Sequence, residues 1–544
     1  MANAKYSLPF PANEPVKSYT TGTGERQALK TTLAALRDQQ IEIPLIIGGE
    51  DVKTGRMGDC VLPHDHRSVV AQYHKAGKRE IDMAIRAALR AREKWATMDW
   101  YERVAVFLKA AELLSGSWRH TMNAANMLGQ SKNVFQAEID SACELIDFFR
   151  FNCSYALQIF EQQPPYSPYG TWNRMEYRPL EGFVFAVTPF NFVSIAGNLP
   201  SCPAIMGNVT LWKPASSAVY PAYHLMKLFK EAGLPDGVIN FIPGPGSAVG
   251  PEVLVSPDLA GIHFTGSTST FQSMWKTVGE NITRYRSYPR IIGETGGKDF
   301  VIAHRSAELH ALGVALIRGA FEYQGQKCSA ASRAYIPNSL WEELRVYLLT
   351  ELKTVKMGDV EDFSNFMNAV IDREAFSRIA GYIDYAKKSG EAQIIFGGGC
   401  NDSKGFFIEP TLILTENPHF RTMEEEIFGP VLTLYVYDDE KYEETLHLCD
   451  STSPYGLTGA VFARDRSAVV FAECVLQNAA GNFYINDKPT GAVVGQQPFG
   501  GGRASGTNDK AGSLWNMLRW VTPRAIKENF VPPIDYRYPF MAEG

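Results

Sequence analysis

The run Phe183-Val-Phe-Ala-Val187 is uniformly apolar and is followed at once by the turn-like Thr188-Pro-Phe-Asn-Phe192. A short apolar run without alternation predicts a strand that is buried on both faces. Similar runs recur downstream and are separated by helical stretches such as residues 220–232; they lie at residues 209–213, 238–242 and 261–265. Repeated strand–helix units predict an α/β fold with a parallel sheet wound by helices, an architecture that often carries a nucleotide.

The segments before this core differ in character. Residues 1–40 are polar and predict an irregular arm followed by a short helix, whereas residues 41–48 predict a single strand ended by a glycine turn. Apolar residues recur at helical spacing from about residue 78 to residue 160. Residues 163–180 mix prolines, aromatics and polar side chains, which favours an exposed strand or hairpin.

A second α/β series follows the first, from about residue 300 to residue 483. Within it, strands are predicted near residues 334–336, 393–396 and 431–437. The tail from Trp520 to Pro533 ends in proline-flanked apolar residues. We therefore expect the tail to dock elsewhere, on another subunit.

Composition excludes several classes of function. The 544 residues are 45% hydrophobic, enough for two or three domains, and the net charge of −6 offers no positive field to nucleic acid or an anionic membrane. The eight cysteines lack metal-ligand spacing, so we expect no metal site and a reducing compartment. The N-terminal residues show no leader pattern and no apolar run is long enough for a membrane span. We expect a cytoplasmic protein, or a mitochondrial matrix protein if a transit peptide was removed.

A thiol and a carboxylate form the strongest local signal. Cys328 lies in Gly325-Gln-Lys-Cys-Ser-Ala330, and Glu294 lies 34 residues earlier in the glycine-rich Ile292-Gly-Glu-Thr-Gly-Gly-Lys298. A thiolate can attack a carbonyl carbon, and a carboxylate can activate water to release the resulting acyl enzyme. Taken alone, such a cysteine is more often a small buried hydrophobic residue, and such a glutamate an ordinary surface residue.

Asn191 is a third candidate, because it follows the buried strand that ends at Val187. An asparagine amide in this place can donate a hydrogen bond to an oxyanion. A turn-capping asparagine is an equally good interpretation of the same residue.

From about residue 49 to its end, the chain resembles the aldehyde dehydrogenase superfamily. Six motifs of that family occur here in the family's order: Asn191 after its Thr-Pro turn, Lys213-Pro214, Phe264-Thr-Gly-Ser267, Glu294, Cys328 and Glu426-Ile-Phe-Gly-Pro430. The resemblance implies an α/β aldehyde dehydrogenase fold with a Rossmann-like NAD-binding domain, a catalytic domain and a small β oligomerisation element. The domains implied are residues 1–162 and 181–297 for NAD, 298–500 for catalysis, and 163–180 with 501–544 for oligomerisation.

The resemblance also implies a role for each matching residue. Cys328 is the expected nucleophile, Asn191 and the Cys328 backbone N–H the oxyanion donors, and Glu294 the general base. Lys213 and Glu426 match positions that bind the two riboses of NAD, and Phe428 helps position the nicotinamide. The remaining residues expected to line the cofactor cleft are Thr188, Gly266, Ser267, Thr268, Ser269 and Thr270.

The choice of cofactor is affected by one departure from the family pattern. Many NAD-preferring relatives carry a glutamate three residues after the lysine, where it repels a 2′-phosphate; here Ser216 occupies that position. We expect NAD as the cofactor, with some use of NADP at lower efficiency.

Within the family, the chain looks like the branch that oxidises L-glutamate γ-semialdehyde, which forms from pyrroline-5-carboxylate, to L-glutamate. The segments that carry this resemblance are residues 144–152, 325–329, 481–501 and 503–509. Ser329, Gly491 and Ala492 are implied to bind the substrate carboxylate, and Phe192 and Phe499 to enclose its aliphatic stem. Alternatively, Ser329 only packs and the two aromatics belong to the core.

Other functions remain open from the sequence. Another semialdehyde, such as that of succinate or aminoadipate, is the main alternative substrate. A coenzyme A-acylating enzyme is disfavoured by the presence of Glu294, and a non-catalytic binding protein by the presence of Cys328, Glu294 and Asn191 together. We expect a homodimer or a higher homo-oligomer, and a separate proline dehydrogenase that supplies the substrate.

Overall fold

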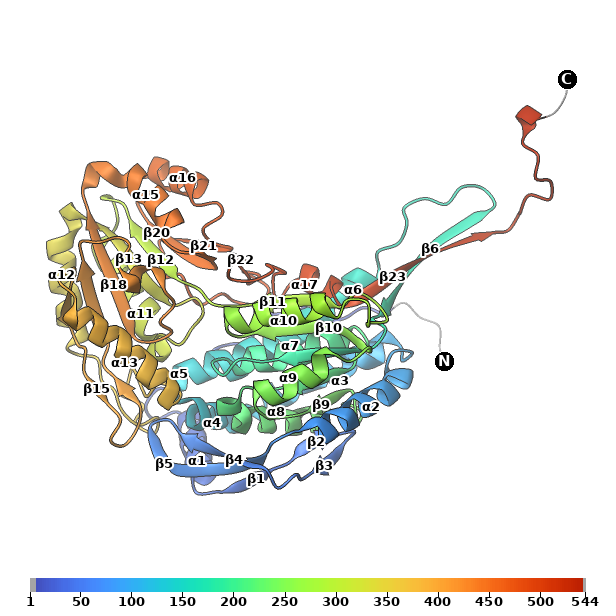
Figure 1. The fold of residues 1–544 in the computed structure, drawn as a ribbon, viewed down its shortest axis with the longest axis horizontal. Helices are drawn as coiled ribbons and strands as arrows, with labels where there is room; N and C mark the ends of the chain where they lie inside the picture. The colour runs from blue at the N-terminus through green and yellow to red at the C-terminus, as the bar shows by residue number, and fades with distance from the viewer. Residues whose placement is uncertain (1–5, 542–544) are drawn as a thin grey trace.

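The computed structural model describes residues 6–541. Residues 1–5, which carry part of the expectation about an N-terminal leader, and residues 542–544 of the tail lie outside the described part. Two halves, each built on a seven-stranded sheet, make up the body, and a two-stranded arm projects from it (Figure 1). Among the described residues, no helix is long and apolar enough to cross a membrane.

The first large sheet has the strand order β11-β10-β7-β8-β9-β2-β3. Its strands are β2 (Leu45–Ile47), β3 (Glu50–Val52), β7 (Phe183–Val187), β8 (Thr210–Lys213), β9 (Ile239–Phe241), β10 (Leu259–Thr265) and β11 (Arg290–Glu294). Every residue of β7, β8 and β10 is buried, which explains their apolar sequences. The strands from β11 to β9 are parallel, so their carboxyl ends share one edge of the sheet.

Helices from the first 280 residues surround this sheet (Figure 1). They are α1 (Gly24–Arg37), α2 (Lys78–Trp95), α3 (Trp100–Ser115), α4 (Arg119–Gln130), α5 (Val134–Ala137), the π-helix η1 (Glu138–Glu144), α6 (Leu145–Phe160), α7 (Val193–Ile205), the 3₁₀ turn η2 (Ser216–Ala218), α8 (Val219–Ala232), α9 (Gly246–Leu254) and α10 (Thr268–Glu280). One continuous apolar core joins them to the sheet. The helical pattern predicted for residues 78–160 is confirmed, with η1 as a local widening of the helix.

The second large sheet has the order β14-β17-β18-β13-β12-β20-β21. Its strands are β12 (Asp299–Ala303), β13 (Ala331–Pro337), β14 (Ala392–Phe396), β17 (Thr411–Thr415), β18 (Val431–Tyr437), β20 (Thr458–Phe462) and β21 (Asn482–Ile485). Two separate apolar clusters contain side chains of this sheet, together with its helices. The helices are α11 (Leu309–Phe321), η3 (Glu322–Gly325), α12 (Asn338–Leu352), α13 (Arg373–Lys388), α14 (Arg421–Glu424), η4 (Asp439–Lys441), α15 (Tyr442–Ser451) and α16 (Arg466–Val475).

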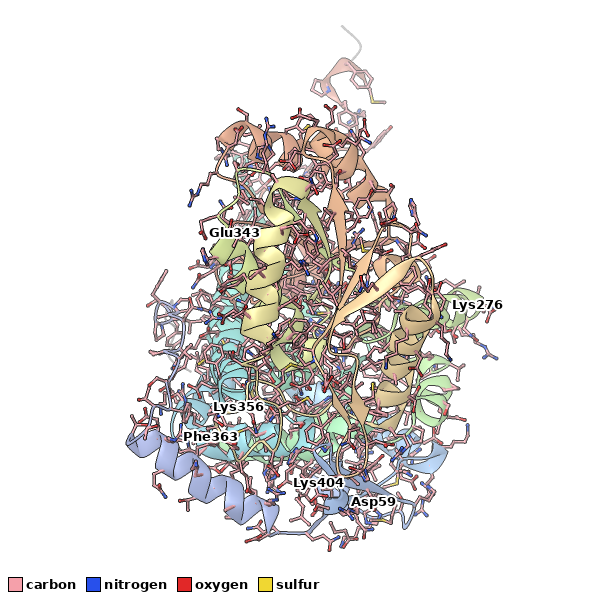
Figure 2. The ribbon with its side chains drawn as sticks, turned by 90° about the vertical axis from the view of Figure 1, so that its left-hand side faces the viewer. Asp59, Lys276, Glu343, Lys356, Phe363 and Lys404 are labelled. Atoms are coloured by element: carbon pink, nitrogen blue, oxygen red, sulfur yellow. The ribbon has the colours of Figure 1, made fainter. Side chains whose placement is uncertain are left out.

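Four residues, 295–298, connect the two large sheets between β11 and β12. The carboxyl edge of the first sheet therefore lies next to the amino edge of the second. The smaller elements are two strand pairs, a short helix and a turn in the tail: β15 (Cys400–Asn401) with β16 (Phe407–Ile408), β19 (Tyr455–Gly456) with β22 (Gly502–Arg503), α17 (Leu514–Leu518) and η5 (Pro539–Met541). The two halves also meet where Phe406 N–H donates to the Pro63 carbonyl at 2.9 Å, two residues after Lys404, which Figure 2 labels.

The single strand predicted for residues 41–48 is wrong. The segment forms two strands that belong to different sheets: β1 (Ile41–Ile43) pairs with β5 (Asp65–His74), which also pairs with β4 (Met57–Leu62), whereas β2 joins the large sheet. Pro44 separates the two strands. Proline has no N–H to donate to a ladder, so the chain changes partners there.

The projecting arm pairs β6 (Thr171–Pro179) with β23 (Val521–Asn529) in antiparallel register, from Pro179 opposite Val521 to Thr171 opposite Asn529. The exposed strand predicted within residues 163–180 is therefore confirmed. The C-terminal tail docks first on β6 of its own chain, and its docking on another subunit stays a prediction. The domain boundaries stay predictions as well.

Candidate active site

Cys328 and Glu294 approach each other across the joint between the two sheets. Cys328 lies in the loop between η3 and β13 and is partly exposed, and Glu294 is the last residue of β11. A Cβ atom placed on Gly297 would lie 2.2 Å from the Cys328 carbonyl oxygen, a distance that only glycine permits. The loop after Glu294 therefore packs directly against the loop that carries the thiol.

The backbone before Cys328 is strained. Tyr323, Gln324 and Gly325 all have positive φ, at 51°, 56° and 67°. The Gln324 side chain offsets part of this cost, because its Nε2 donates to the carbonyl oxygens of Ser131 (3.0 Å) and Ala369 (2.7 Å). Non-glycine residues persist in the left-handed region only where their surroundings fix them, and such strain is typical of functional loops.

Asn191 is 3% exposed and its Nδ2 donates to the carbonyl oxygen of Gln326 at 3.1 Å. The amide therefore lies against the loop of Cys328, two residues before the thiol. This position suits an oxyanion donor better than a turn cap, because the amide reaches across to the second half of the molecule. The role itself stays a prediction.

Burial raises the pKa of the Glu294 carboxyl well above its usual value. Gly501 N–H donates to Glu294 Oε2 at 3.4 Å, and a Cβ on Gly500 would lie 2.8 Å from Oε1, so the glycines keep the loop close. Lys510 favours the ionised form by its charge and fixes that loop, since its Nζ donates to the Gly500 carbonyl at 2.8 Å. A carboxylate with a raised pKa is a stronger base, as water activation requires.

The thiol of Cys328 has a pKa well above its usual value, first because of burial and then because of the charges of Asp299, Glu294 and Glu426. The protein alone therefore holds the thiol protonated near neutral pH. Activation by Glu294, a backbone dipole or the bound cofactor all remain consistent with this environment.

We expect Asp299→Asn to lower the pH midpoint for alkylation of Cys328 by iodoacetamide. Burial raises the pKa of Asp299 to about 8, so its carboxyl ionises in the alkaline range where it opposes formation of the thiolate. Removing that negative charge stabilises the thiolate, and alkylation at pH 9 becomes faster. Peptide-resolved mass spectrometry measures the rate across pH, with Asp384→Asn on the exposed face of α13 as the matched control. An unchanged midpoint in Asp299→Asn would contradict this account of the thiol.

The residues predicted to line the cofactor cleft gather at the carboxyl edge of the first sheet. Thr188 follows β7, Lys213 ends β8, and residues 266–270 lead from β10 into α10. These strands are parallel neighbours, so their ends lie side by side. Ser267 caps α10, and Thr270 N–H donates to its hydroxyl at 3.3 Å.

The polar groups at this edge fit a dinucleotide. Lys213 is buried, and among the described residues its ammonium group has no hydrogen-bond partner; burial lowers its pKa to about 8. Glu426 accepts from Gly297 N–H at 2.9 Å through Oε1, which leaves Oε2 free for a ribose hydroxyl. The N-terminus of α10 offers backbone N–H groups of the kind that bind phosphate. Exposed Ser216 lies within hydrogen-bond reach of Tyr73 at the same edge.

Phe428 has a positive φ of 56° and meets Phe190 edge-on, with ring centroids 5.7 Å apart. A bulky residue adopts this backbone only where its surroundings hold it. The ring is thus fixed between Glu426 and the turn that carries Asn191, consistent with the predicted role in positioning the nicotinamide.

The predicted carboxylate site lies next to the nucleophile loop. The hydroxyl oxygens of Ser329 and Thr490 are 2.8 Å apart, and Gly491, with φ of 97°, follows directly. Within the described residues, the backbone N–H groups of Gly491 and Ala492 donate no hydrogen bond, so both remain available to a ligand.

The two predicted aromatic walls are both partly exposed. Phe192 lies under the Lys132 ammonium group, 4.5 Å from its ring centroid, and Phe499 is held by backbone hydrogen bonds to Ala511 at 3.0 and 2.8 Å. No contact joins the two rings to each other, so their enclosure of one substrate stays a prediction.

The model of the Aldehyde dehydrogenase family matches residues 52–526 of this sequence. The chain belongs to the aldehyde dehydrogenase family. The predicted family and fold are therefore confirmed, and the matched region contains all the candidate site residues named above.

Among members of the family, the chain is similar to enzymes named delta-1-pyrroline-5-carboxylate dehydrogenase. It is 52% identical to the mitochondrial protein of Dictyostelium discoideum over 99% of this chain and 97% of that one, and 50% identical to the human mitochondrial protein over 97% and 94%. A solved structure of the enzyme from Mycobacterium tuberculosis, bound with NAD, is 52% identical, covers both chains completely and superposes with a TM-score of 0.96. The predicted branch of the aldehyde dehydrogenase family is confirmed.

Motif reasoning missed several residues of this aldehyde dehydrogenase site. Lys298 is buried with an unpartnered ammonium group, and burial lowers its pKa to about 7. Thr490 links the two substrate loops, and Lys510 fixes the loop beside Glu294. Lys298 is the last residue of the glycine-rich motif at residues 292–298. Nothing in that motif indicates that its ammonium group is buried without a hydrogen-bond partner. Lys510 directly follows the segment of residues 503–509, but the two carbonyl groups that its ammonium group contacts lie 10 and 29 residues away in the sequence.

Proposed function

We propose that this chain catalyses the NAD-dependent oxidation of L-glutamate γ-semialdehyde, formed from pyrroline-5-carboxylate, to L-glutamate in proline degradation. Relatives with this enzyme's name share about half of the residues over nearly the whole length. The aldehyde dehydrogenase residues and the polar groups for a dinucleotide are all present. The names of the relatives and the geometry of the site support the same reaction.

The proposed chemistry follows from the positions of three side chains. After the Cys328 thiol has given up its proton, the thiolate sulfur bonds to the aldehyde carbon and the C=O π electrons move to oxygen. The oxyanion that forms accepts hydrogen bonds from Asn191 Nδ2 and the Cys328 backbone N–H. NAD, when bound, supplies the acceptor for the hydride that leaves this carbon. The thioester that remains is attacked by a water molecule that gives its proton to Glu294, which releases the carboxylic acid and restores the thiol.

One observation carries the choice of substrate. Two unused backbone N–H groups, at Gly491 and Ala492, stand beside the Ser329–Thr490 contact and hence beside the nucleophile. Adjacent N–H groups in a glycine turn form an anion-binding concavity, and the Lys488 ammonium group lies close by, 3.2 Å from a Cβ placed on Gly491. An aldehyde with a carboxylate at its far end fits both parts of this site, whereas a simple aldehyde uses only one.

The test is NADH formation with purified protein and NAD, compared between pyrroline-5-carboxylate, succinate semialdehyde and propanal. A kcat/KM at least about 100-fold higher for pyrroline-5-carboxylate supports the proposal, since a well-made charged hydrogen-bond set contributes roughly that factor. A preference for succinate semialdehyde would assign another semialdehyde. Absence of turnover with all three would indicate a non-catalytic member of the family.

The preference for NAD over NADP can be tested by substitution of Ser216. We expect Ser216→Glu to lower kcat/KM for NADP by about 10-fold or more and to leave NAD largely unaffected. A carboxylate at this position accepts hydrogen bonds from the ribose hydroxyls of NAD but repels the 2′-phosphate of NADP. Initial rates with each cofactor give the ratio, with Ser216→Ala as the matched control. An equal fall for both cofactors would place Ser216 away from the adenosine ribose.

We also propose that the protein acts as a homodimer or a higher homo-oligomer. The arm of β6 and β23 supports this, because it and the adjoining tail expose many large apolar side chains, among them Trp172, Phe530 and Ile534.

A separate proline dehydrogenase supplies the substrate, and no nucleic acid takes part. Free thiols at all eight cysteines fit a reducing compartment, the cytoplasm or the mitochondrial matrix.

A further inference from the structure

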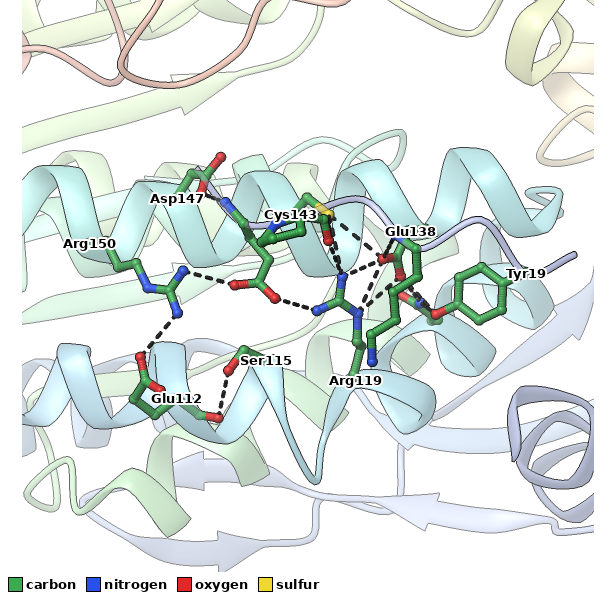
Figure 3. Close-up of polar contacts among 12 residues, drawn as sticks. Tyr19, Glu112, Ser115, Arg119, Glu138, Cys143, Asp147 and Arg150 are labelled. Carbon is green, nitrogen blue, oxygen red and sulfur yellow. Dashed lines mark hydrogen bonds and ion pairs between the residues drawn. The ribbon is translucent and has the colours of Figure 1, made fainter. Parts of the chain in front are cut away.

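Residues 13–19 form a strap that contacts helices α4 and α6 and the π-helix η1. Two arginines hold it: Arg119 on α4 pairs with Glu14 at 2.5 Å, and Arg150 on α6 pairs with the same carboxylate at 2.8 Å. Figure 3 shows Arg119 beside the wholly buried Glu138, and Arg150 with Glu112. The strap is therefore built into the polar interior of the first half.

Glu138 anchors the far end of the strap. Its carboxylate accepts from Lys17 N–H at 2.9 Å and from the Tyr19 hydroxyl at 2.8 Å, and it also pairs with Arg119. Arg119 is 1% exposed and Glu138 0%. Breaking one partner of such a buried pair leaves an uncompensated charge, so the strap has one strongly determined position.

Asn13 stands at the near end of the strap and uses every polar atom of its side chain. Its Nδ2 donates to Asp147 Oδ2 at 2.8 Å and to the Val494 carbonyl at 2.7 Å, and its Oδ1 accepts from Gln496 Nε2 at 2.9 Å. Glu14 N–H donates to the other oxygen of Asp147 at 2.7 Å. The Asn13 amide thus joins helix α6 to a loop that lies 481 residues after Asn13 in the sequence.

The loop that Asn13 holds is the loop of the proposed carboxylate site. Val494 follows Ala492 by two residues, and between them Val493 opens a tight turn, with its carbonyl accepting from Gln496 and Gln497 N–H at 3.0 and 2.9 Å. Thr490 fixes the other end of the loop through Ser329. The loop that contains Gly491 and Ala492 is therefore held on one side by the contact of Thr490 with Ser329 and on the other by the contact of Val494 with Asn13.

We propose that Asn13 is a specificity-determining positioning residue: the N-terminal strap, acting through it, sets the two backbone N–H groups that receive the substrate's carboxylate. This inference rests on the proposed function. Asn13 itself touches neither the substrate nor Cys328. Its effect is confined to substrates that carry the distant carboxylate, because hydrogen bonds to an anion depend steeply on donor placement.

The test is Asn13→Ala, with KM and kcat measured separately for pyrroline-5-carboxylate and for propanal. We expect KM for pyrroline-5-carboxylate to rise about 10-fold while kcat changes less than threefold and both constants for propanal stay unchanged. Val16→Ala is the matched control, since Val16 lies in the same strap and the residue is 52% exposed. Equal losses with both substrates, or no loss with either, would overturn the inference.

A second variant removes the partner from the other side. Gln496→Ala breaks the contact between its Nε2 and Asn13, so its effect on KM for pyrroline-5-carboxylate should not add to that of Asn13→Ala. Full additivity would also overturn the inference. The wild type provides the distinction from the parent proposal. If the wild-type enzyme does not prefer pyrroline-5-carboxylate over propanal, the proposed function is wrong. If the wild type has this preference and Asn13→Ala keeps it, only the inference about Asn13 is wrong.

Discussion

Cys328→Ala is expected to abolish NADH formation with every aldehyde, a fall of about 10⁴-fold or more in kcat. Gly297 and Asn191 both contact the loop that carries Cys328, which places this thiol next to the loop of Glu294. No other cysteine lies in the loop of Cys328. Without the sulfur there is no covalent adduct from which a hydride can leave. The measurement is absorbance of NADH over hours at high enzyme concentration.

The same variant should still bind NAD with unchanged affinity, measured by calorimetry, because Lys213 and Glu426 keep their positions. Cys400→Ala is the matched control, since that thiol is exposed on β15, outside the loop that carries Cys328, and its activity should equal that of the wild type. Residual turnover of Cys328→Ala above one percent would mean that another group carries the chemistry.

Glu294→Gln should give one rapid equivalent of NADH per active site and then almost stop. Hydrolysis of the thioester needs the carboxylate, whereas a backbone dipole or the bound cofactor can activate the thiol for attack, so we expect the acyl enzyme to accumulate. The steady-state rate should fall by about 10²–10⁴-fold. Stopped-flow absorbance gives the burst, and intact mass spectrometry identifies the acyl group on Cys328.

The pH dependence gives an independent check on Glu294. Burial raises its pKa, so in the wild type the ionised base becomes more abundant as pH rises through that value, and the rate of hydrolysis rises with it. The glutamine variant should lack this rise. Glu343→Gln on the exposed face of α12, labelled in Figure 2, is the matched control. A variant that loses the burst as well would assign Glu294 to the first step.

Local sequence patterns predicted the elements that are decided locally. The strand at Phe183–Val187 is apolar throughout because it is buried on both faces, and the helix predicted for residues 220–232 became α8 at Val219–Ala232. The break at Pro44 was visible as a proline, but which sheet each half of the segment joins depends on partners far along the chain. Pairing of β6 with β23 likewise joins residues about 350 positions apart.

The candidate site divides in the same way. Cys328, Glu294 and Asn191 were found because each lies in a short motif, and the structure adds that their loops touch. Ser329 was named, but its partner Thr490 is 161 residues away and carries no local signal. Asn13 could not be found from sequence at all, since its meaning lies in an amide that reaches a loop 481 residues later.

The two unused backbone N–H groups at Gly491 and Ala492 also bear on attempts to redirect the enzyme. A pocket that recognises its ligand through a side chain can be altered by a single codon, but the peptide backbone is the same whatever residue is chosen. Redesign of these two contacts toward uncharged aldehydes would therefore require a different loop length or a proline that deletes a donor, rather than a change of side chain alone.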